Sequence, residues 1–411
     1  MLIGLLRVAT LFLAAAFAAS ASDALLDGPT GPQVSNEILQ TARISLSQAR
    51  AEHGEKSLPA ARLQARLGVL LMLAERPAEA RRELEPAVVG LQRHLGVFAA
   101  ELFEPYTYLG LSEQALGRHE EAADAFSRGQ HISHRHQGLL NEEQVPLVLA
   151  KAASLDVLGE RWEVEQLYRN AIKLRQKNSG AGAPETVQAI STLGLWLTMQ
   201  GRYYHALTLF RSARKQLEET QAAAVPELLT LLRGNAVALV YAPPAYQSSA
   251  LDLLREAKEL AGTRPEALSP EQRFAAVIGL ADMLMMFSRE REALEVYQEA
   301  WALAKLEPVL GDATIIRLKQ QKLVRGPFLP LDPDHLEGQV WFRVAFDLRA
   351  DGRPSRIRIV DSNARLKSRR AAKEYFQKTR FRPLLSADGA PLPRKDQEIW
   401  VAFAEPSIPL S

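Results

Sequence analysis

Residues 109–129 read LGLSEQALGRHEEAADAFSRG, and residues 193–213 read LGLWLTMQGRYYHALTLFRSA. Each stretch places two glycines, an alanine and a phenylalanine at the same offsets: Gly110, Gly117, Ala122 and Phe126 in the first, and Gly194, Gly201, Ala206 and Phe210 in the second. The second glycine indicates the end of a helix, because glycine adopts the left-handed conformation there at the lowest cost. Alanine and phenylalanine four residues apart lie on one face of a following helix. Each stretch is therefore predicted to be a helical hairpin.

The pattern recurs along most of the chain at an almost constant spacing. Its first small residue returns with a period of about 42 residues, at Gly68, Gly110, Ala152, Gly194, Ala238 and Ala281. Such a period is typical of a solenoid in which each repeat is one hairpin packed between its neighbours. We therefore predict a mainly α fold, an α–α superhelix with six repeats over residues 60–305. Helices over residues 36–51 and 313–323 are expected to close its two ends.

The repeated positions resemble the tetratricopeptide repeat, in the longer form of kinesin light chain-like proteins. Repeat five departs from the pattern, because residues 241–245 (YAPPA) replace the glycine turn, and we expect a distorted hairpin there. The resemblance implies a concave groove, lined by the first helix of each repeat, that binds a peptide of a partner. By the family's register, the polar groove positions are Glu104, Thr107, Gln114, Asp156, Gln188, Ser191, Thr198, Asn235 and Asp282. The apolar positions between them are Val69, Leu111, Leu195, Ile278 and Met285.

A different pattern begins after the repeats. Residues 326–333 (GPFLPLDP) contain three prolines and indicate an extended linker. Apolar and polar residues then alternate from Val340 to Leu348, as in a half-buried strand, and Asp351-Gly352 indicates a hairpin turn. The remaining pattern predicts a small α+β domain. Its elements are expected in the order strand, strand, helix, strand, at residues 340–348, 356–360, 366–378 and 398–403.

This domain resembles the C-terminal domain of the TonB family. The resemblance rests on Gly352, Ser362, the run Arg380-Phe381-Arg382-Pro383, Gly389, Pro391 and the final Val401-Ala402-Phe403. It implies that the domain binds an extended segment of another protein by adding a strand to its sheet. The last strand is the expected exposed edge, with residues Glu398, Ile399, Trp400, Val401, Ala402 and Phe403.

The TonB family couples inner-membrane proton motive force to outer-membrane receptors. A membrane-anchored energy transducer for outer-membrane transport is therefore the alternative function. Energy-transducing members carry an uncleaved N-terminal membrane helix with a functional histidine and a long proline-rich spacer. In this chain the first histidine is His53, and helical repeats occupy the place of the spacer. The resemblance thus favours the fold and the strand-addition surface over energy transduction.

The N-terminus is typical of a secretory signal. One positive charge in residues 1–7 precedes an apolar run over residues 8–19, and Ala19-Ser20-Ala21 offers the small residues that signal peptidase requires. We expect cleavage between Ala21 and Ser22 and a periplasmic protein. The alternative is an uncleaved inner-membrane anchor, and only then is membrane association expected.

Several function classes are disfavoured by composition. There is no cysteine, and Lys+Arg (50) nearly equals Asp+Glu (48), so neither thiolate chemistry nor a nucleic-acid partner is expected. His131, His134 and His136 are the one histidine cluster, without further ligands in sequence. We expect no metal, no cofactor and no catalytic residues, although a hydrolase with an unrecognised site stays a third alternative. The expected partners are proteins or peptides, among them outer-membrane or other envelope proteins.

The leading hypothesis is a periplasmic adaptor that binds one partner in the repeats and a second at the C-terminal sheet. Its predicted parts are a signal peptide (1–21), an N-terminal helix (22–59), the repeats (60–305), a capping helix with linker (306–337), the C-terminal domain (338–404) and a tail (405–411).

Overall fold

The computed structural model describes residues 34–219, 224–307, 310, 323–325, 328–331 and 340–403. The described chain divides into two compact units, one ending at Ala189 and the other beginning at Ile190. The predicted signal peptide with its Ala21-Ser22 cleavage site lies outside the described residues. So do the C-terminal tail and residues 313–322 of the predicted closing helix. Among the described helices, none is both long enough and apolar enough to span a membrane.

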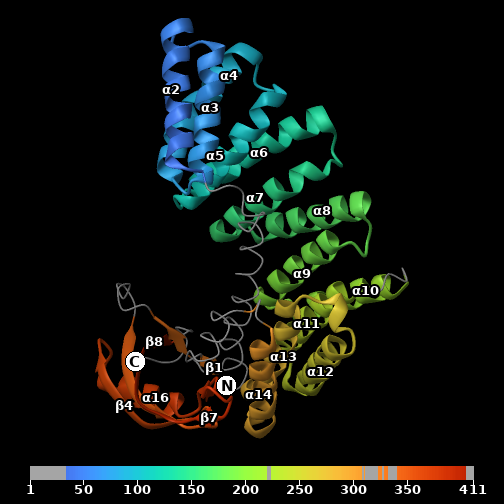
Figure 1. Ribbon diagram of the computed structural model, residues 1–411, viewed down its shortest axis with the longest axis vertical. Helices are drawn as coiled ribbons and strands as arrows, with labels where there is room; N and C mark the ends of the chain where they lie inside the picture. The colour runs from blue at the N-terminus through green and yellow to red at the C-terminus, as the bar shows by residue number, and fades with distance from the viewer. Residues whose placement is uncertain are drawn as a thin grey trace. The chain divides into compact units, whose positions relative to one another are not determined.

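Helical hairpins form most of the described chain (Figure 1). Three hairpins precede the boundary between the units. They pair α3 (Leu58–Leu73) with α4 (Pro77–Leu95), α5 (Phe103–Ala115) with α6 (His119–Gln137), and α7 (Val145–Leu158) with α8 (Arg161–Ser179). The boundary falls within α9 (Pro184–Met199), which pairs with α10 (Tyr203–Glu219). Then follow α11 (Val225–Tyr241) with α12 (Gln247–Thr263), and α13 (Pro270–Met286) with α14 (Glu290–Leu306). These six hairpins confirm the mainly helical fold and the predicted repeats.

The helix ends follow the glycines of the repeat. Gly117, Gly159 and Gly201 have φ angles of 75°, 83° and 75°, so the predicted left-handed turns within hairpins are confirmed. A second series, not predicted, ends the helices that precede a new repeat. Its members share the spacing of the repeat and have φ between 86° and 96°: Gly54, Gly96, Gly138 and Gly180. Helix α2 (Asn36–His53) ends at the first of them, so it has the register of a second helix.

The first small residue of each repeat is required by close packing between the two helices of the hairpin. A Cβ atom on Gly110 would lie 2.5 Å from the ring of Phe126, and one on Gly194 would lie 2.4 Å from the ring of Phe210. Both rings are fully buried. The recurring pair of a small residue and an aromatic residue therefore sets how closely the helices of a repeat approach.

The C-terminal domain is a small antiparallel sheet covered by one helix. Its main sheet has the order β2-β8-β3-β4, and two short pairs, β1 with β5 and β6 with β7, lie beside it. The helix α16 packs against β4, and the rings of Phe376 and Phe381 lie 5.0 Å from that of Phe346 in the core. The bounds are β1 (Leu323–Arg325), β2 (Phe328–Pro330), β3 (Trp341–Leu348), β4 (Pro354–Ser362), α16 (Leu366–Phe376), β5 (Arg380–Phe381), β6 (Leu384–Leu385), β7 (Pro391–Leu392) and β8 (Arg394–Phe403).

Two predictions about this domain are wrong. Part of the segment read as a linker is the strand β2, which pairs with residues 401–403 of β8. Because β3 pairs with the other side of β8, residues 401–403 of the last strand lie inside the sheet and are not its edge. Proline content suggested a linker, but β2 lies at the edge of the sheet, where a strand needs hydrogen bonds on one side only.

In repeat five the connection between α11 and α12 differs from the glycine turns of repeats two, three and four. A short 3-10 helix, Pro244–Tyr246, joins the two helices where residues 241–245 were expected to distort the hairpin. Similar short helices, Ala100–Leu102, Glu142–Gln144 and Pro265–Ala267, precede α5, α7 and α13.

Candidate functional site

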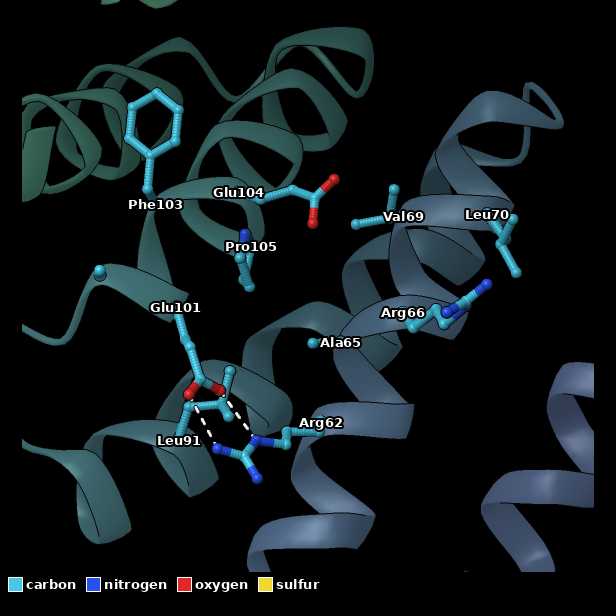
Figure 2. A pocket seen from close by; sticks show the side chains of 11 residues that line it. Arg62, Ala65, Arg66, Val69, Leu70, Leu91, Glu101, Phe103, Glu104 and Pro105 are labelled. Carbon is cyan, nitrogen blue, oxygen red and sulfur yellow. Dashed lines mark hydrogen bonds and ion pairs between the residues drawn. The ribbon is translucent and has the colours of Figure 1, made fainter. Parts of the chain in front are cut away.

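A cavity of about 580 Å³ lies between the first helices of repeats one and two (Figure 2). Its apolar surface comes from Ala65 and Val69 of α3, Leu91 of α4 and Pro105 of α5. These four side chains are buried in the hairpins, so they present a preformed apolar floor. Val69, which was predicted as an apolar groove position, lines this cavity.

One side of the cavity is closed by an ion pair. The Arg62 guanidinium donates two hydrogen bonds to the Glu101 carboxylate, both of 2.8 Å. The hydrogen bond from Arg62 lowers the pKa of Glu101, although both side chains are about half exposed. Figure 2 shows the pair bridging α3 and the 3-10 helix before α5. It therefore links the first helices of two successive repeats.

A second cation and a second carboxylate line the same cavity without closing it. Arg66 follows Arg62 by one helical turn, and Glu104 lies three residues after Glu101. Both are exposed, and neither forms an ion pair with a residue in the described part of the chain. In Figure 2 the Glu104 carboxylate extends across the gap towards Val69. The mouth of the cavity thus offers an unpaired donor group and an unpaired acceptor group above an apolar floor.

Three other predicted positions in this unit serve contacts within the repeats. The Gln114 side chain of α5 donates hydrogen bonds to the Ala150 carbonyl (3.2 Å) and the Ser154 hydroxyl (3.0 Å) of α7. The Thr107 hydroxyl donates to the Phe103 carbonyl at 2.9 Å. Asp156 is half-buried, and its charge adds to burial in raising the pKa of Tyr168 to about 12. Gln188, in contrast, is exposed on α9.

Predicted groove positions of the second unit are largely enclosed. Ser191 and Thr198 are buried within α9, and the Thr198 hydroxyl donates to the Gly194 carbonyl at 2.8 Å. Asn235 is half-buried, and its Oδ1 atom is enclosed without a hydrogen-bond donor in the described chain. The prediction that Ser191 and Thr198 face a partner is therefore wrong. The backbone of its own helix satisfies the Thr198 hydroxyl, whereas the Ser191 hydroxyl is enclosed without a hydrogen-bond partner in the described chain.

Asp282 is the predicted groove position whose surroundings differ most from those of an open groove. It is buried in α13, where the hydroxyl of Tyr297 donates to it at 2.6 Å. The Arg382 guanidinium of the C-terminal domain donates two hydrogen bonds to the same carboxylate, at 3.1 and 2.7 Å. Asp282 is thus not open to a partner peptide, contrary to the prediction, because the chain's own arginine occupies it.

One part of the predicted strand-addition edge pairs with β2, and the other part does not. Val401, Ala402 and Phe403 pair with β2, and the Leu331 amide donates to the Trp400 carbonyl at 2.8 Å. No strand of the described chain pairs with Glu398 or Ile399 on the side away from β3. The Glu398 side chain accepts a hydrogen bond from Arg343 at 2.8 Å. Only this first part of the predicted edge is therefore open among the described residues.

The histidines have structural contacts that the sequence analysis did not predict. His94 and His136 each contact a backbone carbonyl that lies just before the first helix of their own repeat. In repeat three, Asn178 donates to the carbonyl at the corresponding position. The three contacts recur with the period of the repeats: His94 with Lys56 (2.7 Å), His136 with Phe98 (2.6 Å) and Asn178 with Leu140 (3.1 Å). Within the described chain, no group of three or more His, Asp or Glu residues could hold a metal ion.

Comparisons with known proteins find matches among solved structures. No family model and no curated protein matches the chain. Among solved structures, the chain is similar to kinesin light chain TPR-like repeats from Podosopora anserina (17% identity, TM-score 0.43, covering 53% of this chain and 98% of that one). It is also similar to BtubC from P. vanneervenii (14%, 0.42, 56% and 92%) and to a Rap protein complexed with competence and sporulation factor (14%, 0.39, 68% and 79%). These structural neighbours are TPR-like repeat proteins.

Proposed function

We propose that the chain is a non-enzymatic protein-interaction scaffold whose first two repeats bind an extended segment of a partner protein. The observation that carries the proposal is the cavity between α3 and α5, with unpaired Arg66 and Glu104 at its mouth. A peptide backbone offers both an N–H donor and a carbonyl acceptor. Glu104 would accept from the first and Arg66 would donate to the second. An apolar side chain of the peptide would then fill the space above Val69 and Pro105.

The proposal extends to the periplasm and to a second partner. The N-terminal pattern of residues 1–21 supports export, with Ser22 as the first residue of the mature chain. The strand order and the residues shared with the TonB C-terminal domain support strand addition at the sheet. Its place would be beside Glu398 and Ile399, the part of β8 that β2 leaves unpaired among the described residues.

The peptide-binding proposal is tested by selection on the intact protein. A displayed peptide library is selected on the full chain, and the enriched peptides are measured by fluorescence anisotropy. Glu104→Lys and Val69→Asp should each weaken binding at least about tenfold, because a lost contact of about 1.4 kcal/mol has that effect. Glu185→Lys is the matched control, since Glu104 and Glu185 are each the second residue of a first helix. Enriched peptides that bind all three variants as tightly as the native chain would refute the proposed site.

Export has its own test, independent of peptide binding. The full-length gene product is expressed in a Gram-negative host and purified from both the periplasmic and the membrane fraction, and its N-terminal residues are sequenced. A chain that begins at Ser22 supports the periplasmic proposal. An intact Met1 in the membrane fraction would instead support the membrane-anchored alternative.

A further inference from the structure

We propose that the sixth repeat is an arginine-binding site whose ligand is the chain's own C-terminal domain. The site consists of Asp282, Tyr297 and Glu290, and its occupant is the segment Arg380-Phe381-Arg382. This assignment concerns the second unit alone and does not depend on the peptide-binding proposal for the first two repeats.

The centre of the site is the buried pair of Asp282 and Arg382. Their side chains are only 6% and 9% exposed, and two hydrogen bonds join them. Burial acts to lower the pKa of Arg382, but the Asp282 carboxylate outweighs it, so that pKa is raised. The hydroxyl of Tyr297 donates to the same carboxylate, and the Arg382 guanidinium carbon lies 6.0 Å from the centre of the Tyr297 ring. A buried charge of this kind is tolerated only when its partner is in place.

A second carboxylate at the start of α14 binds two more arginines of the domain. Glu290 accepts hydrogen bonds from Arg380 at 2.8 Å and from Arg353 at 3.1 Å. Burial acts to raise the pKa of Glu290, but the hydrogen bonds from these arginines outweigh it and lower that pKa. Three arginines thus meet two carboxylates of one hairpin: Arg353 from the turn before β4, Arg380 from β5 and Arg382 from directly after β5.

Close packing at two glycine turns of the C-terminal domain supports the same assignment. A Cβ atom on Gly352 would lie 2.3 Å from the Phe381 carbonyl and 3.3 Å from the Met285 side chain. A Cβ atom on Gly389 would lie 2.5 Å from the Trp301 ring. Both glycines belong to Asp-Gly turns of the C-terminal domain. The Gly389 turn approaches the Trp301 ring of the hairpin as closely as glycine allows, and the Gly352 turn lies against Met285. The Lys305 ammonium also donates to a backbone carbonyl of the second turn at 2.6 Å.

The acceptor is specific to repeat six. Asp282 directly follows the small first residue of its repeat. The other five repeats have an aliphatic side chain at that position: Val69, Leu111, Ala153, Leu195 and Leu239. A carboxylate therefore replaces a hydrophobic residue only in the repeat that contacts the C-terminal domain. The domain is accordingly a fixed extension of the last hairpin and not a freely tethered second binding module.

Distance measurements between spin labels test this directly on the full chain. The chain has no cysteine, so labels can be placed only at introduced ones. Arg291→Cys on α14, where the native side chain is 96% exposed, and Arg370→Cys on α16 are suitable positions. We expect one narrow distance distribution in the otherwise native chain. The Asp282→Leu variant has the leucine that repeats four and five carry at this position. Both this variant and Arg382→Gln should abolish the narrow peak.

The matched control is Arg214→Gln, which removes the pair of Arg214 with Glu256 (2.7 Å) between α10 and α12 and should keep the narrow peak. If Asp282→Leu loses its helical circular dichroism, the double variant Arg380→Gln/Arg382→Gln decides, because it leaves every residue of the sixth repeat unchanged. A broad distribution in the native chain, or a narrow one in both Arg382→Gln and the double variant, overturns the proposal.

Discussion

The first and sixth repeats place different residues at the same position of their first helix. The surface at that position is open in repeat one and occupied by another part of the chain in repeat six. Val69 in repeat one forms part of an apolar floor beneath an open cavity, with Arg66 and Glu104 unpaired at its mouth. Asp282 in repeat six is buried, and Arg382 from elsewhere in the chain neutralises it. An apolar side chain at this position leaves a surface that can stay unoccupied. A carboxylate requires a partner, because a buried charge without one is strongly destabilising.

The largest expected effect comes from breaking the pair in repeat six. Arg382→Ala leaves Asp282 buried without a cation and should lower the free energy of unfolding by ~3–5 kcal/mol. Urea denaturation followed by tryptophan fluorescence measures the change. The comparison variant is Arg62→Ala, which breaks the exposed pair with Glu101 and should change stability far less. Equal losses in the two variants would contradict the contrast between the two repeats.

A smaller effect is expected from the close packing of the Gly352 turn within the C-terminal domain. Gly352→Ala introduces a side chain at φ +79° against the Phe381 carbonyl, and should cost ~1–3 kcal/mol. Gly279→Ala is the control, since it lies inside α13 with no atom within 4 Å of its added Cβ. That change should stabilise the chain by up to ~1 kcal/mol through helix propensity. Thermal unfolding of both variants checks the opposite signs, and a neutral Gly352→Ala would show that the turn is not held there.

The pH dependence of the sixth repeat provides a finer test. The pKa of Glu290 is lowered in the folded chain, so its contribution to stability is fully present above the ordinary carboxyl value of 4.5. It is lost as the pH falls through the lowered value, because protonation removes the attraction to Arg380 and Arg353. The difference in unfolding free energy between native chain and Glu290→Gln should therefore be constant near neutrality and shrink below about pH 4.5. A difference that grows on acidification would contradict the proposed contacts.

The sequence was sufficient for the repeats because their information is local and recurs. Each hairpin carries its own small first residue, three carry a turn glycine (Gly117, Gly159 and Gly201), and four carry an aromatic residue (Phe126, Tyr168, Phe210 and Tyr297), so the copies reinforce one interpretation. The β-hairpin around Gly352 was predictable for the same reason. The edge of the sheet was not, because β2 reads as a proline-rich linker and gains its identity only by pairing with β8, at the far end of the C-terminal domain.

The contacts of the sixth repeat also escaped prediction, although one signal was present. Asp282 and Arg382 are 100 residues apart, and nothing in either local stretch indicates the other. The family register places Asp282 among the groove positions, and the Arg380-Phe381-Arg382 run indicates only a resemblance to the TonB family. What could have been noticed is that Asp282 stands where five other repeats have aliphatic residues. In an array of units that share a pattern, such an exception points to a contact that the other units lack.

The smallest expected effect concerns the open mouth of the cavity in the first two repeats. The double variant Arg66→Gln/Glu104→Gln removes both charges, and both side chains are exposed. Its free energy of unfolding should stay within about 0.5 kcal/mol of the native value, as for most surface substitutions. If the variant instead lost more than ~1 kcal/mol, the two side chains would be interacting in the free protein, and the energy would exceed that of a typical exposed ion pair. The first repeats would then resemble the sixth, with charges already committed within the chain. A neutral result leaves both groups available to bind a partner's backbone, because residues that contribute nothing to folding can be satisfied by a ligand without loss of stability.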